Sequence, residues 1–358
     1  MKSKIKSKKY SDLITFGIVI IAFILMQGLT SLGLISSLLK GLLVPLCCYS
    51  ILAVSLNLTV GIMGELSLGH AGFMCVGAFA SAFFSKVIVY YNPSFPAGLR
   101  FFFAIIIGAL FAAIFGFLIG IPVLRLKGDY LAIVTLAFGE IIKNLINILY
   151  VGLDSDGFHI SFKSSLDLHM ANSDDIILNG PQGITGTPND SSFFIGIILL
   201  LITLFIVLNL IRSRDGRAIM AIRDNTIAAE SIGIPITAYK MMAFVISASL
   251  AGVAGALYAH NLSTLTALPK NFGYNMSIMI LVFVVLGGIG NIRGSMISAV
   301  ILTLLPELLR GLNNYRMLIY AIVLIVMMLF NWAPACIEWR KMLVAKIKNK
   351  NTSKKEVA

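Results

Sequence analysis

The chain has 358 residues, of which 58% are hydrophobic and only 12% are charged. Soluble globular domains carry about 25% charged residues, so this composition excludes an ordinary cytosolic enzyme. The net charge of +12 is concentrated in the two ends and a few short loops, which argues against a nucleic-acid-binding face. The sequence therefore predicts a polytopic membrane protein.

Stretches without Asp, Glu, Lys or Arg mark the helices that we expect to cross the membrane, since about 20 mostly apolar residues span its hydrocarbon core. Eight stretches qualify: 13–39, 41–64, 66–85, 101–124, 191–211, 241–269, 271–292 and 317–337. Two further apolar segments, 130–151 and 294–312, each contain one acidic and one basic residue. We expect an all-α polytopic membrane protein with about ten transmembrane helices.

The charges of the loops predict the orientation of the chain, because Lys and Arg are enriched in cytoplasmic segments. The basic tails, 1–12 and 338–358, and the Arg-rich loop 212–240 are expected inside, where the tails also contact anionic lipid. The loop 152–190 has six Asp against one Lys and is expected outside. Residues 13–337 then form one transmembrane domain with both termini cytoplasmic. Five helices on each side of the outer loop suit an inverted repeat.

Residues 61–79 combine many glycines with Glu65, Ser67 and His70. This composition predicts a broken helix, which at membrane depth is tolerated only where it is buried in protein or lines an aqueous cavity. A helix that begins at such a break presents free N–H groups, which suit an anionic substrate group. Close helix packing through the glycines explains the same residues equally well.

Glu140 lies within an apolar segment, five residues after Thr135. A carboxylate within the membrane is costly and suggests function, but Lys143 lies on the same helix face, so a structural ion pair is the alternative. Glu65, Ser67, His70, Thr135 and Glu140 are our candidates for lining a translocation pathway.

We expect no catalytic residue, no metal and no cofactor on this chain. The glycines of 287–294 have the spacing GxGxxxG rather than GxGxxG and follow an apolar helix rather than a strand, so they favour a tight turn over a nucleotide loop.

The loop 212–240 predicts two short amphipathic helices that end at Gly233 and Pro235. Met220, Ile227 and Ile234 are spaced as one apolar stripe. The mixed charges of the loop suit a groove on a partner protein better than anionic lipid.

The pattern Ala228-Ala229-x-x-x-Gly233 resembles the EAA-type coupling loop of ABC importer permeases, which docks onto the ATPase. With Ser213-Arg-x-Gly-Arg217 and Ala221-Ile-Arg-Asp-Asn225, the loop is similar to that of the branched-chain amino-acid permease family of the LivM type. Further blocks of the family occur at 64–78, 128–142, 179–184, 240–244, 251–258 and 287–290. The sequence departs from the family at Ile227 (Glu in the broader motif), Ser295 (commonly Pro) and Pro334-Ala-Cys336 (commonly Pro-x-Gly).

The resemblance implies a permease subunit of an importer in the bacterial inner membrane. Its implied partners are a second, LivH-type permease, two cytoplasmic ATPases that bind ATP and Mg, and an extracellular or periplasmic substrate-binding protein. The implied substrates are branched-chain or related amino acids, with urea or short amides as the alternative. The resemblance assigns coupling to the ATPase to the following residues: Arg214, Gly216, Arg217, Ala221, Arg223, Ala228, Ala229 and Gly233.

Two other classes of function compete with this interpretation. An ion-coupled secondary transporter would use Glu140 and Glu65 as its proton- or ion-binding carboxylates. A membrane-embedded enzyme has no nucleophile or metal-binding constellation in the sequence to support it.

Overall fold

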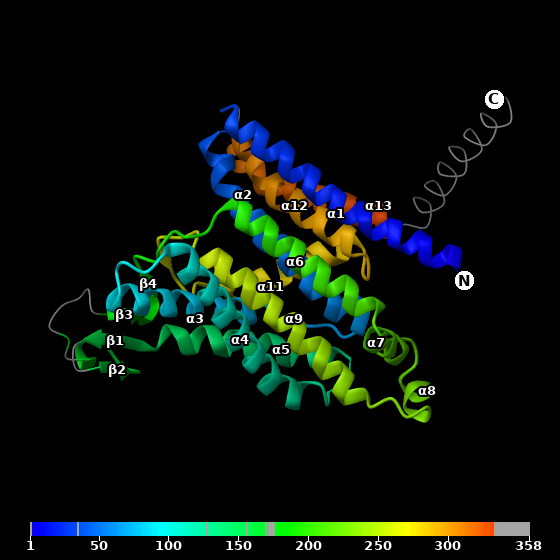
Figure 1. The fold of residues 1–358 in the computed structure, drawn as a ribbon, viewed down its shortest axis with the longest axis horizontal. Coiled ribbons are helices and arrows are strands. Elements are labelled where there is room, and N and C mark those ends of the chain that lie inside the picture. Colours follow the sequence, from blue (N-terminus) through cyan, green and yellow to red (C-terminus); the bar gives the residue numbers. More distant parts are fainter. Residues whose placement is uncertain are drawn as a thin grey trace. The chain divides into compact units, whose positions relative to one another are not determined.

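The computed structural model describes residues 2–33, 36–126, 128–154, 157–168, 170 and 176–332. Its first half contains helices α1 (Lys2–Ser31), α2 (Ser37–Asn57), α3 (His70–Tyr91), α4 (Ala97–Val123), α5 (Asp129–Asn147) and α6 (Phe193–Arg212) (Figure 1). The second half contains α7 (Arg214–Asp224), α8 (Thr226–Ser231), α9 (Ile236–Ala259), α10 (Pro269–Phe272), α11 (Tyr274–Gly287), α12 (Ile292–Leu308) and α13 (Arg316–Trp332). The chain divides into two compact units, Met1–Val300 and Ile301–Ala358.

Among the described residues, eight helical segments are long and apolar enough to cross a membrane. They are Ile14–Ser31, Leu39–Met63, His70–Tyr91, Ala97–Val123, Phe193–Arg212, Ile236–Ala259, Pro269–Gly287 and Ile292–Gly311. This confirms the predicted polytopic all-α membrane fold. Helices α5 and α13, with 19 and 17 residues, correspond to the other two predicted spans. The count of ten, the inverted repeat and the cytoplasmic termini stay predictions.

The basic tails differ in how much of them the structure describes. Residues 2–12 of the predicted N-terminal tail are helical and form the beginning of α1. The predicted tail 338–358 and the departure at Pro334-Ala-Cys336 lie outside the described residues.

Two predicted spans end earlier than their apolar sequences do. Helix α9 ends at Ala259, not at 269, and the chain after it forms strand β5 (Thr264–Leu265). Helix α5 ends at Asn147, not at 151, and Tyr150–Asp154 form strand β1. A stretch without charges can be a helix end or a buried strand, so composition alone placed both boundaries wrongly.

A small antiparallel sheet occupies the segment between α5 and α6, for which the sequence predicted an outer loop and no strands. Strand β1 pairs with β2 (Gly157–Ser161) on one side and with β3 (Ile176–Asn179) on the other. Strand β4 (Ile184–Thr185) pairs with β5, which ties this segment to the chain after α9. Val151 and Leu153 are buried on β1, while Phe158 and Ile160 are exposed on β2.

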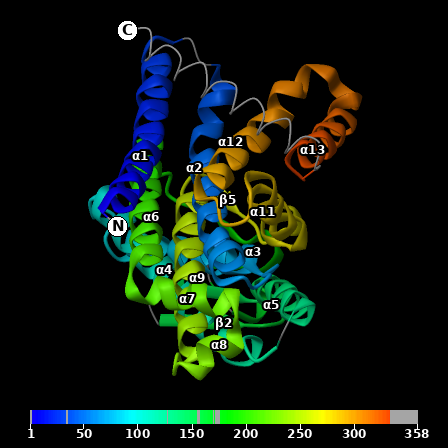
Figure 2. The ribbon, with the colours of Figure 1, turned by 90° about the vertical axis from the view of Figure 1, so that its right-hand side faces the viewer.

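Helix α9 is the centre of the first unit and packs against α2, α3 and α4 (Figure 2). Small residues four apart on its face, Ala248, Gly252 and Ala256, allow this close approach. A Cβ placed on Gly252 would lie 2.5 Å from the Ala112 side chain, and one placed on Gly77 of α3 would lie 2.3 Å from the backbone of Gly252. The small-residue pattern therefore serves contacts within this bundle.

Candidate functional site

The predicted break in the helix is present and begins with a π-helical segment. Helix α2 continues as η1 (Leu58–Met63), a π-helix, which ends at Gly64 with φ of +81°. Glycine adopts this left-handed conformation without the cost that a side chain would add. Helix α3 begins only at His70, so residues 64–69 form an irregular connection, here called the re-entrant segment. π-Helical turns occur frequently at functional sites.

Side chains of α2, α5 and α11 bond to the re-entrant segment and to the start of α3. His70 Nε2 lies 2.7 Å from the hydroxyl oxygen of Ser55, a residue eight positions before the end of η1. The backbone N–H of Leu68 donates to Thr135 Oγ1 at 3.0 Å, and that of Ala71 donates to Ser277 Oγ at 3.2 Å. Side chains of α5 and α11 thus satisfy backbone N–H groups at and just before the start of α3.

Ser67 differs from its neighbours because its side chain has no partner. Its hydroxyl is one of three buried side-chain oxygens without a hydrogen bond in the described part of the chain. A buried hydroxyl without a partner costs about 1–3 kcal/mol, so a polar atom that reached Ser67 would gain a free hydrogen-bonding group.

The five predicted pathway residues do not form one cluster. Ser67, His70 and Thr135 lie together at the re-entrant segment. Glu65, at its beginning, pairs with Lys240 of α9. Glu140 pairs with Lys143 and accepts a hydrogen bond of 2.7 Å from the backbone N–H of Tyr274, at the start of α11. The hydrogen bond from Tyr274 therefore joins α5 to the start of α11, while the ion pair with Lys143 lies within α5.

The loop 212–240 forms the predicted helix pair, α7 and α8. Ser213 begins α7 by accepting a hydrogen bond of 2.9 Å from the Gly216 N–H, and Asn225 begins α8 by accepting one of 3.0 Å from the Ala228 N–H. These are N-cap contacts typical of Ser and Asn. Gly233 follows α8 with φ of +82°, and Pro235 precedes α9, which confirms the predicted end of the pair.

The predicted apolar stripe through Met220, Ile227 and Ile234 is wrong. The buried residues are Ile219 and Ile222 on α7 and Ala229 on α8, whereas Ile227 is 79% exposed. The stripe assumed one continuous helical phase, but the chain is extended at Asn225 between the two helices, so the phase does not continue. Ile232, after α8, is also exposed, at 76%.

Several residues that the resemblance assigns to ATPase coupling contact the membrane helices, and their role in coupling stays a prediction. Arg217 donates to the backbone oxygen of Arg212 at the end of α6 at 2.9 Å, and Gly216 is buried against the same end. Arg223 reaches further and donates from Nη1 to the Gly61 oxygen of η1 at 2.8 Å. Arg214 and Ala228 are exposed, and Ala221 is partly buried.

Sequence reasoning missed the contacts that hold η1 in place. Asn57 donates from Nδ2 to Ser295 Oγ at 2.7 Å and accepts from the Gly290 N–H at 2.8 Å. Thr59 donates to Ser247 Oγ of α9 at 2.8 Å. The usable signal was a buried Asn in an otherwise apolar span, together with a Ser where the family commonly has Pro.

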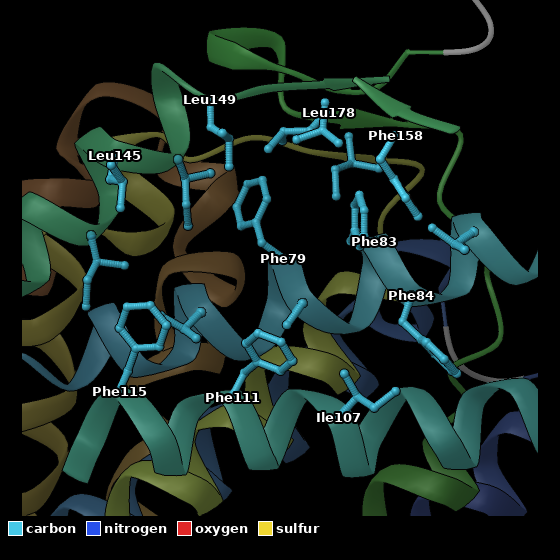
Figure 3. A pocket seen from close by; sticks show the side chains of 17 residues that line it. Phe79, Phe83, Phe84, Ile107, Phe111, Phe115, Leu145, Leu149, Phe158 and Leu178 are labelled. Atoms are coloured by element: carbon cyan, nitrogen blue, oxygen red, sulfur yellow. The ribbon is translucent and has the colours of Figure 1, made fainter. Parts of the chain in front are cut away.

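An apolar cavity of about 520 Å³ lies between α3, α4 and α5 and the small sheet. Figure 3 shows Phe79 and Phe83 of α3, Phe111 of α4 and Leu178 of β3 pointing into it. All its lining side chains are apolar, so a charged or zwitterionic ligand would lose its hydration there without gaining a polar partner. The described residues also contain no group of three or more His, Cys, Asp or Glu that could hold a metal ion.

Comparison with known proteins identifies relatives over most of the chain. Residues 38–329 match the family described as "Branched-chain amino acid transport system / permease component". The LivM proteins of Salmonella typhimurium and Escherichia coli, both named high-affinity branched-chain amino acid transport system permease proteins, are 36% identical over 80% of this chain and 66% of their own length. The fructose import permease protein FruG of Bifidobacterium longum is 27% identical over 59% of the chain and 60% of its own length. No solved structure matches.

Proposed function

Because the chain belongs to the family of branched-chain amino acid transport permease components, we propose that it is one permease subunit of an ATP-driven importer for branched-chain amino acids. The observation that carries this proposal is the 36% identity to two LivM proteins over 80% of the chain. The matched part covers less than two thirds of the length of each relative. The eight apolar helices and the bacterial relatives make it a multi-pass protein of the inner membrane.

In this proposal α7 and α8 face the cytoplasm and receive an ATPase subunit. The exposed side chains of Ile227 and Ile232 support this, because large apolar side chains on an otherwise polar surface are suited to become buried in an interface with a partner. Two ATPases that hold ATP and Mg, a second permease and a substrate-binding protein complete the proposed importer.

The proposed substrate path follows the re-entrant segment. Ser67 contributes a free hydroxyl and α3 contributes the positive end of its dipole, which together suit the carboxylate of an amino acid. The apolar cavity between α3, α4 and α5 is unsuited to the charged groups of an amino acid and is not assigned to the path.

The test is uptake of labelled leucine by proteoliposomes that contain this chain, the second permease and the ATPases, with the binding protein outside and ATP inside. We expect uptake that requires every component and continues in the presence of a protonophore. Uptake by this chain alone, or uptake abolished by the protonophore at constant ATP, would instead favour an ion-coupled secondary transporter. Labelled urea and acetamide, offered in the same vesicles, test the alternative substrate class.

A further inference from the structure

Two cationic side chains from the coupling loop and the start of α9 hold the end of η1 and the re-entrant segment. Arg223, in the last turn of α7, donates to the Gly61 oxygen at 2.8 Å. Lys240, near the start of α9, pairs with Glu65. The two contacts lie on either side of Gly64, the residue with φ of +81° at which the helix ends.

The environment of Arg223 fits its contact with the helix end. The last carbonyls of a helix have no partner within it and carry a partial negative charge, which a guanidinium satisfies. A Cβ on Gly64 would lie 2.4 Å from Cγ of Arg223, so the stem of Arg223 packs directly on the break. Asp224, which is 69% exposed, accepts a hydrogen bond of 2.8 Å from Nη2 of Arg223.

The beginning of η1 is held by different elements. Asn57 bonds to Ser295 and to the backbone of Gly290, and Thr59 bonds to Ser247. The beginning is therefore fixed to α9, α12 and the turn before α12, whereas the end contacts α7 and the first turns of α9. A displacement of α7 would act on the end of η1 while its beginning stays in place.

We propose that Arg223 and Lys240 transmit the movement of the coupling loop to the re-entrant segment and are positioning residues for transport. This inference rests on the proposed function, because it requires an ATPase that moves α7. The guanidinium of Arg223 pulls on the Gly61 carbonyl, and the ammonium of Lys240 carries Glu65 with α9. The segment that contains Ser67 then moves relative to Thr135 and Ser277.

The first experiment compares Arg223→Gln with Asp224→Asn in the complete complex reconstituted in proteoliposomes. For each variant, the number of ATP molecules hydrolysed per leucine transported is measured. We expect Arg223→Gln to lower uptake about tenfold while ATP hydrolysis stays within about twofold, a loss of coupling typical of allosteric links. Asp224→Asn keeps the contact with Gly61 and should leave the ratio unchanged. A purely structural role for Arg223 would lower the yield of complex and both activities together, and an unchanged ratio in Arg223→Gln would overturn the proposal.

The second experiment exchanges the charges of the other contact. Glu65→Lys and Lys240→Glu each place like charges together and should raise the ATP-to-leucine ratio about tenfold. The double variant restores an ion pair with reversed polarity and should return the ratio to within about threefold of the unmodified complex. Failure of the double variant to recover, with the complex assembled, would exclude Lys240 from the link. Absence of uptake by the unmodified complex would instead overturn the proposed function itself.

Discussion

The two ends of the first unit are held together in different ways (Figure 1). At the end where the strands lie, a buried ion pair joins α4 to the segment before α6, and β4 pairs with β5. At the end where α7 and α8 lie, a single side chain, Arg223, bonds to the backbone of η1. Arg100 makes hydrogen bonds of 2.9, 2.8 and 2.6 Å to Asp190, and both side chains are only 10% exposed. Ser85 lies 2.8 Å from His260 in the same region. Arg223, by comparison, is 37% exposed where it reaches Gly61.

The difference shows how one bundle can combine a fixed end with a movable end. A bidentate, nearly buried ion pair is costly to separate, so the strand-bearing end holds α4 and α6 in place. At the end that carries α7 and α8, Arg223 reaches Gly61 from a more exposed position, and a small displacement of α7 can change this contact. The predictions below test this contrast, beginning with the largest expected effect.

Substitution of Arg100 by Gln should destabilise the protein by about 3–5 kcal/mol, because Asp190 would stay buried without its counter-charge. The measurement is thermal denaturation of the purified chain in detergent. The double substitution Arg100→Met with Asp190→Leu should recover most of the loss, since an apolar pair leaves no buried charge unpaired. Arg310→Gln is the control: Arg310 is 58% exposed in its ion pair with the partly buried Glu307, and the change should cost less than about 1 kcal/mol. A small loss in Arg100→Gln would contradict the rigid end.

Substitution of Ile227 by Ser should weaken binding of the ATPase about tenfold, corresponding to about 1.4 kcal/mol, without changing thermal stability. The measurement is co-purification of the ATPase at increasing dilution. Ile160→Ser, an equally drastic change at an exposed isoleucine on β2, should leave ATPase binding unaltered. Equal effects of the two substitutions would show that α8 is not the docking element.

Substitution of Ser67 by Ala is expected to lower leucine uptake a few-fold, because the free hydroxyl would no longer meet the substrate, and to raise stability by about 1–3 kcal/mol, because a buried hydroxyl without a partner is removed. Ser298→Ala removes another buried hydroxyl without a partner and should raise stability by a similar amount, but leave uptake unchanged. Identical uptake in the two variants would remove Ser67 from the path.

The sequence predicted much of the fold because membrane helices follow from composition. Runs of apolar residues identified the spans, and the glycines around Gly64 predicted the break. The sheet was missed because its strands are too short to differ in composition from a loop, and because β4 and β5 pair residues that are far apart in the chain.

The candidate site was less predictable, since its contacts depend on tertiary structure. Ser67, His70 and Thr135 were identified as polar residues in apolar surroundings, and the structure brings them together. That Glu140 caps α11 could not be read from α5 alone, because its partner, Tyr274, lies 134 residues away. The same holds for Arg223, whose contact with Gly61 spans 162 residues.

The π-helical form of η1 has a geometric consequence for the size of the movement that transport requires. Each residue of an α-helix turns the chain by about 100° but advances it by only about 1.5 Å. If one residue passed through η1 as it changed between π and α winding, the chain beyond Met63 would rotate by about 100° while it advanced by only about 1.5 Å. A small displacement of α7 would then rotate Glu65 and Ser67 about the helix axis.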